Sequence, residues 1–168
     1  MTLGFYENFP SQIHWIESFT SSLPRRQLQQ KLIHLFNEIN RKEFSFEEVA
    51  NPTIPEGRIV FEFGLADSQG FGFIDSEEEK KASAFIAKEH LETLDLFCAI
   101  RYYNGNLKKT PLKFDYYLIR TVFSRNAFEI RVHHERGSRY ISPEDLTLFV
   151  FKKINETSNK KILKKTNH

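Results

Sequence analysis

Apolar residues recur at helical spacing in four stretches of the chain. A short helix after Ser11 would place Ile13, Ile16 and Phe19 on one face, and a longer helix begins near Pro24, which suits a first helical turn. Ser76 is followed by three glutamates and predicts a capped helix that runs to about residue 90. The last helix is expected after the Ser142-Pro143 pair.

Other stretches alternate between apolar and polar residues, as strands with one buried face do. The alternation and the turn signals between the runs predict five strands, at residues 58–65, 70–75, 93–103, 112–123 and 127–135. The expected fold class is α+β: a five-stranded, mainly antiparallel sheet, made of a hairpin, a helix and a three-strand meander, with helices on one face. Residues 1–155 are expected to form a single domain, followed by a basic, mobile C-terminal tail at 156–168.

Composition limits the possible kinds of site. The single cysteine, Cys98, excludes an intrachain disulfide and a cysteine-based zinc site. No apolar run has the roughly 20 residues of a membrane span, and no secretory signal opens the chain, so a cytoplasmic protein without a membrane partner is expected. No cofactor motif and no nucleophile–histidine spacing is found, and no catalytic residue is assigned.

Charge is strongly segregated along the chain. Residues 38–95 contain 14 acidic and 6 basic residues, whereas residues 96–168 contain 15 basic and 6 acidic residues. A whole-chain charge of +2 therefore hides a dipolar protein that attracts partners of opposite sign.

Basic residues and tyrosines are interleaved in the predicted meander. Cations neutralise phosphates and aromatic faces stack unpaired bases, so the leading prediction is a non-enzymatic binding or adaptor module for nucleic acid or another polyanion. The predicted contact residues are Arg101, Tyr103, Lys108, Lys109, Lys113, Arg120, Arg125, Arg131, Arg136 and Arg139. The alternative interpretation is that these cations solvate the open face of the sheet or pair with the acidic half, within one chain or across a homodimer.

A second hypothesis concerns metal-dependent catalysis. Asp115 lies on one predicted strand and Glu129-x-Arg131 on the next, and paired carboxylates can hold a divalent cation that activates water. The order helix, three strands, helix at residues 76–155 resembles the core of restriction-endonuclease-like nucleases, which implies a metal-dependent nuclease as the alternative function. Arg131 stands where that pattern has lysine, and a tight hairpin at 124–126 would place Asp115 several residues beyond Glu129.

A third hypothesis follows from the 17 phenylalanines. A sheet covered by helices and rich in phenylalanine could enclose a pocket for a small apolar ligand between the sheet and the last helix, although a tightly packed core explains the same composition.

Overall fold

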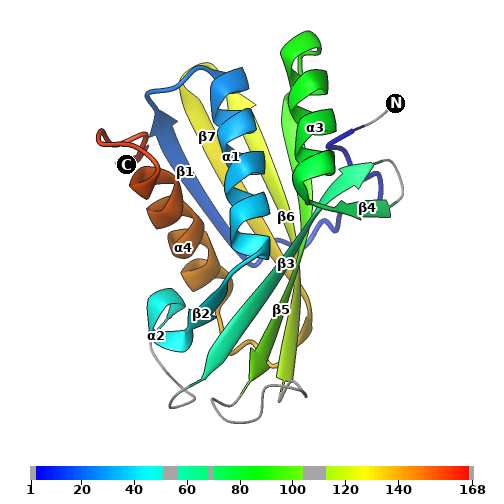
Figure 1. Ribbon diagram of the computed structural model, residues 1–168, viewed down its shortest axis with the longest axis vertical. Coiled ribbons are helices and arrows are strands. Elements are labelled where there is room, and N and C mark those ends of the chain that lie inside the picture. The colour runs from blue at the N-terminus through cyan, green and yellow to red at the C-terminus, as the bar shows by residue number, and fades with distance from the viewer. Residues whose placement is uncertain (1–2, 51–56, 68–69, 104–112, 167–168) are drawn as a thin grey trace.

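A single antiparallel sheet of eight strands organises the molecule in the computed structural model, which describes residues 3–50, 57–67, 70–103 and 113–166 (Figure 1). The strands are β1 (Trp15–Ser21), β2 (Glu43–Ser45), β3 (Arg58–Asp67), β4 (Gly70–Phe73), β5 (Thr93–Tyr103), β6 (Lys113–Ser124), β7 (Ala127–Gly137) and β8 (Leu163–Lys165). The helices are α1 (Arg25–Asn40), α2 (Phe46–Val49), α3 (Ser76–Lys88) and α4 (Pro143–Glu156). The spatial order is β2-β3-β5-β6-β7-β1-β8, and β4 pairs with the distal half of β3.

The predicted α+β class is confirmed, but the predicted sheet of five strands is wrong. Residues 15–21 form β1 instead of the expected helix, and they pair with β7 in the register Trp15↔Val132 to Thr20↔Ala127. The i, i+3 spacing of apolar residues was misleading, because β-branched and aromatic residues in so short a run also suit a strand. Trp15 and Phe19, four positions apart, share the buried face.

The other two missed strands are three residues long. β2 pairs with the start of β3, directly before the capping box of α2 at Ser45 and Glu48. β8 pairs with β1 inside the lysine-rich segment whose composition predicts a mobile tail, and it is held there because Ile162 and Leu163 are buried. Two apolar residues in a polar tail were therefore enough to add an edge strand.

The remaining elements lie close to their predicted positions. The hairpin β3–β4 and the meander β5–β6–β7 match the predicted strands within two residues at each end. The cap of α3 is Asp75, one residue before the predicted cap Ser76. Its side chain accepts a hydrogen bond from the Glu78 amide at 2.8 Å. Ser142 caps α4 as predicted and accepts from the Asp145 amide at 3.0 Å.

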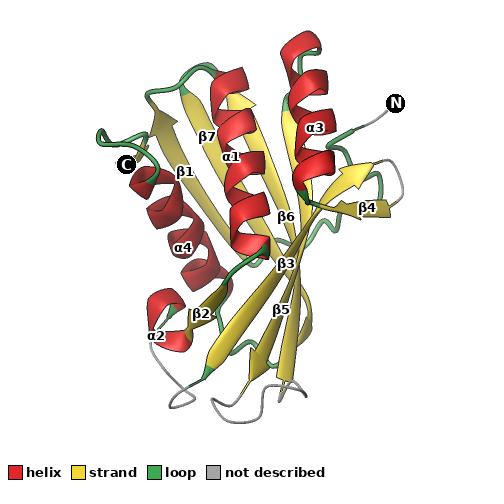
Figure 2. Cartoon of the chain, viewed as in Figure 1, coloured by secondary structure: helices red, strands yellow, loops and turns green. Residues whose placement is uncertain are grey.

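Helices α1, α3 and α4 all lie on one side of the sheet, which we call the covered face (Figure 2). Its core is built of phenylalanine: Phe36 of α1 stacks on Phe63 at 4.4 Å, and Phe149 of α4 stacks on Phe61 at 5.1 Å. All four side chains are buried. Close aromatic packing therefore fills the space between the sheet and the last helix.

The opposite side of the sheet carries no helix, and we call it the open face. Strand alternation assigns to it Phe97 and Arg101 of β5, Tyr116 and Arg120 of β6, and Arg131 of β7. None of the helices in the described part of the chain combines the length and the apolar character that a bilayer crossing needs.

Candidate functional site: the open face of the sheet

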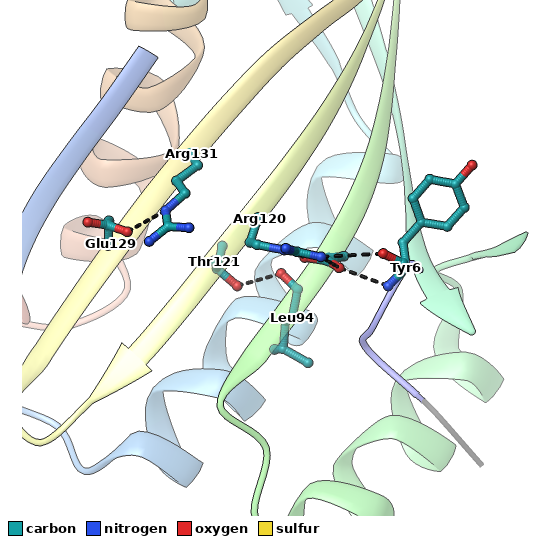
Figure 3. A network of polar contacts seen from close by, with 7 residues as sticks. Tyr6, Leu94, Arg120, Thr121, Glu129 and Arg131 are labelled. Carbon is teal, nitrogen blue, oxygen red and sulfur yellow. Dashed lines mark hydrogen bonds and ion pairs between the residues drawn. The ribbon is translucent and has the colours of Figure 1, made fainter. Parts of the chain in front are cut away.

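Three of the ten predicted contact residues are neutralised by acids. Arg120 binds Asp95 through Nε and a terminal nitrogen, each at 2.8 Å, and Arg131 binds Glu129 at 2.6 Å (Figure 3). Arg101 forms an ion pair with Glu62 on the neighbouring strand β3. These three guanidinium groups therefore contribute little to a net positive potential on the open face.

Four other predicted residues gather at the end of the sheet where β5 and β7 finish and β6 begins. They are Tyr103, Lys113, Arg136 and Arg139. Arg125 lies at the opposite end, in the β6–β7 turn, and Lys108 and Lys109 fall outside the described residues. Within the described part of the chain, no ion pair joins Lys113, Arg136 or Arg139 to an acid. The structure thus brings three unneutralised cations together at one end.

A row of aromatic rings crosses the open face beside these cations. The ring of Phe71 lies 5.8 Å from that of Phe97, Phe97 lies 5.4 Å from Tyr116, and Tyr116 lies 4.8 Å from Phe114. The four rings, which we call the aromatic ladder, come from β4, β5 and β6. Arg101 lies opposite Phe114 and Arg136 lies opposite Tyr116 in the strand register, so guanidinium groups flank the ladder.

The open face also carries the exposed apolar side chains. The large hydrophobic residues that are clearly exposed are Phe5, Ile16, Phe73 and Phe114. Ile16 lies opposite Arg131 and Phe73 lies opposite Gly64, which places both on the open face, and Phe5 lies against Arg120. Among the described residues, all four therefore project from the side without helices, and one of them, Phe114, belongs to the ladder.

The N-terminal segment, residues 3–14, is strapped across the open face from β3 to β1 (Figure 1). Gly4 donates to the Ala66 carbonyl at 2.7 Å, and the Tyr6 amide donates to the buried Asp95 at 2.8 Å. Arg120 lies 4.5 Å from the centre of the Phe9 ring and donates to the Tyr6 carbonyl at 3.3 Å (Figure 3). The Tyr6 ring contacts Phe71 at 4.8 Å, so the strap closes one end of the ladder.

Asp115, proposed from the sequence as a metal ligand, is a fully buried anchor for the loop after β7. Its carboxylate accepts from the Tyr102 hydroxyl at 2.5 Å, from His134 Nε2 at 2.7 Å, and from the amides of Arg139 and Tyr140 at 2.6 and 3.1 Å. Burial and this hydrogen bond raise the pKa of Tyr102 far above its usual range, so Tyr102 stays a donor. Asp115 thereby fixes the loop that carries Arg139.

The backbone of that loop is unusual in two places. Gly137 has φ = 123°, and a Cβ atom there would lie 2.3 Å from the Phe114 carbonyl oxygen. Arg139 itself has φ = 58°. Glycine is required at position 137 because the loop passes so close to the ladder strand β6.

Asp115 and Glu129 do not form a shared cation site. In the β6–β7 register Asp115 lies opposite Gly137, whereas Glu129 lies opposite Val122, seven positions along β6. Asp115 points into the covered face and Glu129 bonds Arg131 on the open face. The described residues contain no group of three potential metal ligands.

Histidine and cysteine side chains also have structural partners. His133 bonds the Gln12 carbonyl on the open face, whereas its neighbour His134 bonds Asp115 on the other side, as strand alternation predicts. Burial raises the pKa of Cys98, so the thiol remains protonated and unreactive.

None of the four ladder residues is among the contact residues that the sequence predicts. Alternation alone would have placed Phe97 with Arg101, and Phe114 with Tyr116, on common faces. Joining them into one row required the β5–β6 and β3–β4 registers, which local patterns do not fix.

No family model, curated protein or solved structure matches the chain.

Proposed function

We propose that the protein is a non-enzymatic binding module that takes single-stranded nucleic acid on its open face. The observation that carries the proposal is the aromatic ladder, Phe71–Phe97–Tyr116–Phe114, on a sheet face that no helix covers. Every unpaired base has a π-face, and base–aromatic stacking contributes about 1–3 kcal/mol per base.

The charges near the ladder favour a strand that enters from one end. Arg136 lies opposite Tyr116 in the strand register, and Arg139 lies on the loop that Asp115 anchors. Exposed cations of this kind can neutralise phosphates while the rings hold the bases. Because Arg101, Arg120 and Arg131 are paired to acids, the proposed contact set is smaller than the sequence predicts, and a modest salt dependence follows.

The proposal is tested by fluorescence anisotropy with labelled single-stranded DNA and RNA of about ten nucleotides, within the usual range of site sizes. Tyr116→Ala and Phe97→Ala should each weaken binding by about 5- to 150-fold, which corresponds to the loss of one stacked base. Tyr116→Phe keeps the ring and should bind like the wild type.

Phe73→Ala supplies the matched control, because Phe73 is exposed on the same face and forms no ring pair with the ladder. It should leave the affinity unchanged. Absence of binding at low salt, or equal losses in the Phe73 and Tyr116 variants, would remove the proposal. A dimer that Tyr116→Ala converts to a monomer in light scattering would instead assign the open face to a second copy of the chain.

A further inference from the structure

A pocket of about 680 Å³ opens on the covered face, between β4 and one side of α3. Its floor is β4 backbone at Gly70 and Gly72. Both glycines face the helix, because Gly72 lies opposite the buried Leu65 and Gly70 shares its side of the strand. A Cβ atom at Gly70 would meet no other atom within 4 Å. The missing side chains therefore leave a space whose volume lies within that of small-molecule sites, about 300–1,000 Å³.

The wall on α3 is apolar in its middle and charged at both ends. The residues of this helix that line the pocket are Glu78, Lys81, Ala84, Phe85 and Lys88. Phe85 lies between Lys81 and Lys88 on the same side of the helix, and Leu3 adds a second apolar group from the N-terminal segment. Leu3 is bridged to Asp67, whose charge is opposite to that of Lys88 at the far end. The apolar stretch is therefore short and ends in charged groups.

Glu78 and Lys81 place opposite charges side by side at the near end of the pocket. The Glu78 carboxylate lies over the floor, 3.3 Å from where a Cβ atom of Gly72 would be. Lys81 follows at i+3, so the two side chains are neighbours on the helix surface. Within the described residues, neither side chain takes part in an ion pair or a side-chain hydrogen bond. An acceptor and a donor of opposite charge at one end suit a ligand group that carries both an ammonium and a carboxylate.

We propose that this pocket binds a free amino acid with an aromatic side chain. Lys81 holds the carboxylate, Glu78 accepts from the ammonium group, and the ring packs against Phe85 above the glycine floor. Lys81 and Lys88, at i and i+7, are roughly 10 Å apart along the helix axis. This length takes one ring with its charged head and excludes a long acyl chain. The inference concerns the covered face and does not depend on strand binding at the open face.

Isothermal titration calorimetry of the full chain tests the ligand class with L-phenylalanine and three analogues. N-acetylphenylalanine lacks the ammonium group, phenylalaninamide lacks the carboxylate, and alanine lacks the ring. Each of the first two should bind about 10- to 100-fold more weakly than phenylalanine, the effect of one lost charge-assisted contact. Alanine should not bind, because it leaves the apolar stretch uncovered.

Variants of the pocket assign each contact. Lys81→Gln should weaken phenylalanine binding and leave the weaker binding of phenylalaninamide unchanged, whereas Glu78→Gln should do the same for N-acetylphenylalanine. Gly70→Leu should abolish all binding, because its side chain enters the open space and its backbone is outside the left-handed region. Lys80→Gln is the matched control, since Lys80 is on the same helix but does not line the pocket.

Urea unfolding of Gly70→Leu checks that the variant still folds, and the Lys81 and Glu78 variants test the proposal without it. Equal affinity for phenylalanine and its two charge-deleted analogues would overturn the proposal, as would tight binding of alanine. Absence of binding at millimolar phenylalanine would also overturn it and leave Glu78 and Lys81 as solvated surface charges. None of these results bears on the ladder, which lies on the opposite face of the sheet.

Discussion

The two faces of the sheet use the same kinds of residue for different purposes. On the covered face, aromatic rings such as Phe61 and Phe149 are buried under helices and stack closely. On the open face, Phe114 remains 39% exposed and its neighbours form a ladder that no helix covers. Aromatic content alone therefore says little about function, whereas the face on which a ring lies decides whether it packs under a helix or stays accessible.

Each face also holds one buried aspartate, and the two are stabilised in different ways. Asp115 on the covered side receives four hydrogen bonds, from the Tyr102 hydroxyl, from His134 Nε2 and from the amides of Arg139 and Tyr140. Asp95 on the open side is paired with Arg120 and with the amide of Tyr6. Both anchor an irregular segment: Asp115 holds the loop before α4, and Asp95 holds the N-terminal strap.

The largest expected difference between the faces is in packing energy. Phe149→Ala should lower the free energy of unfolding by about 3–5 kcal/mol, since it leaves a cavity against Phe61 and Phe44. Phe114→Ala, the same truncation on the open face, should cost about 0.5 kcal/mol because the ring is already partly solvated. Urea unfolding of both variants measures the contrast, and similar losses would show that the open face is part of the core.

A smaller effect distinguishes the two aspartates. Asp115→Asn should lower the free energy of unfolding by about 2–3 kcal/mol, because the NH₂ group of the asparagine side chain would face buried hydrogen-bond donors. Asp95→Asn should cost about 1–2 kcal/mol, since Arg120, with 21% of its side chain exposed, can turn to water.

The two aspartates should also differ in their dependence on salt. Added salt should reduce the difference in free energy of unfolding between Asp95→Asn and the wild type, because salt screens the partly exposed ion pair. The cost of Asp115→Asn should depend less on salt, because Asp115 is fully buried and three of its four partners are the Tyr102 hydroxyl and two backbone amides. A salt dependence as large as that of Asp95→Asn would contradict this expectation.

The sequence predicted elements where local signals agreed with tertiary packing. The caps at Ser142 and near Ser76, and the alternation in β5 to β7, specify structure within a few residues. It failed at β1 and β8, where pairing with distant strands decides the conformation. The basic residues illustrate the same limit, because whether Arg101 is free or paired to Glu62 depends on the β3–β5 register.

The smallest expected effect concerns His14, where the strap enters β1. Burial, with nearby His133, Arg139 and His134, lowers the pKa of His14 below its ordinary 6.5. Its Nδ1 accepts from the His134 amide at 2.9 Å, a bond that the protonated ring cannot form. The folded protein therefore binds fewer protons than the unfolded chain just below pH 6.5, so stability should decrease as the pH falls from 6.5 through the lowered value.

His14→Asn tests this linkage because asparagine retains an acceptor and does not titrate. The variant should show a flatter dependence of the free energy of unfolding on pH below about 6.5 than the wild type, measured by urea unfolding at a series of pH values.

On the covered face the dependence of stability on pH has the opposite sign. Burial raises the pKa of Tyr102 and Tyr117, so their contribution is complete below the usual tyrosine value of 10.0 and is lost as the pH rises above it. Groups on the open face should therefore determine how stability changes in mild acid, and groups on the covered face how it changes in alkali. If the free energy of unfolding of His14→Asn depended on pH below 6.5 as strongly as that of the wild type, this difference between the faces would be contradicted.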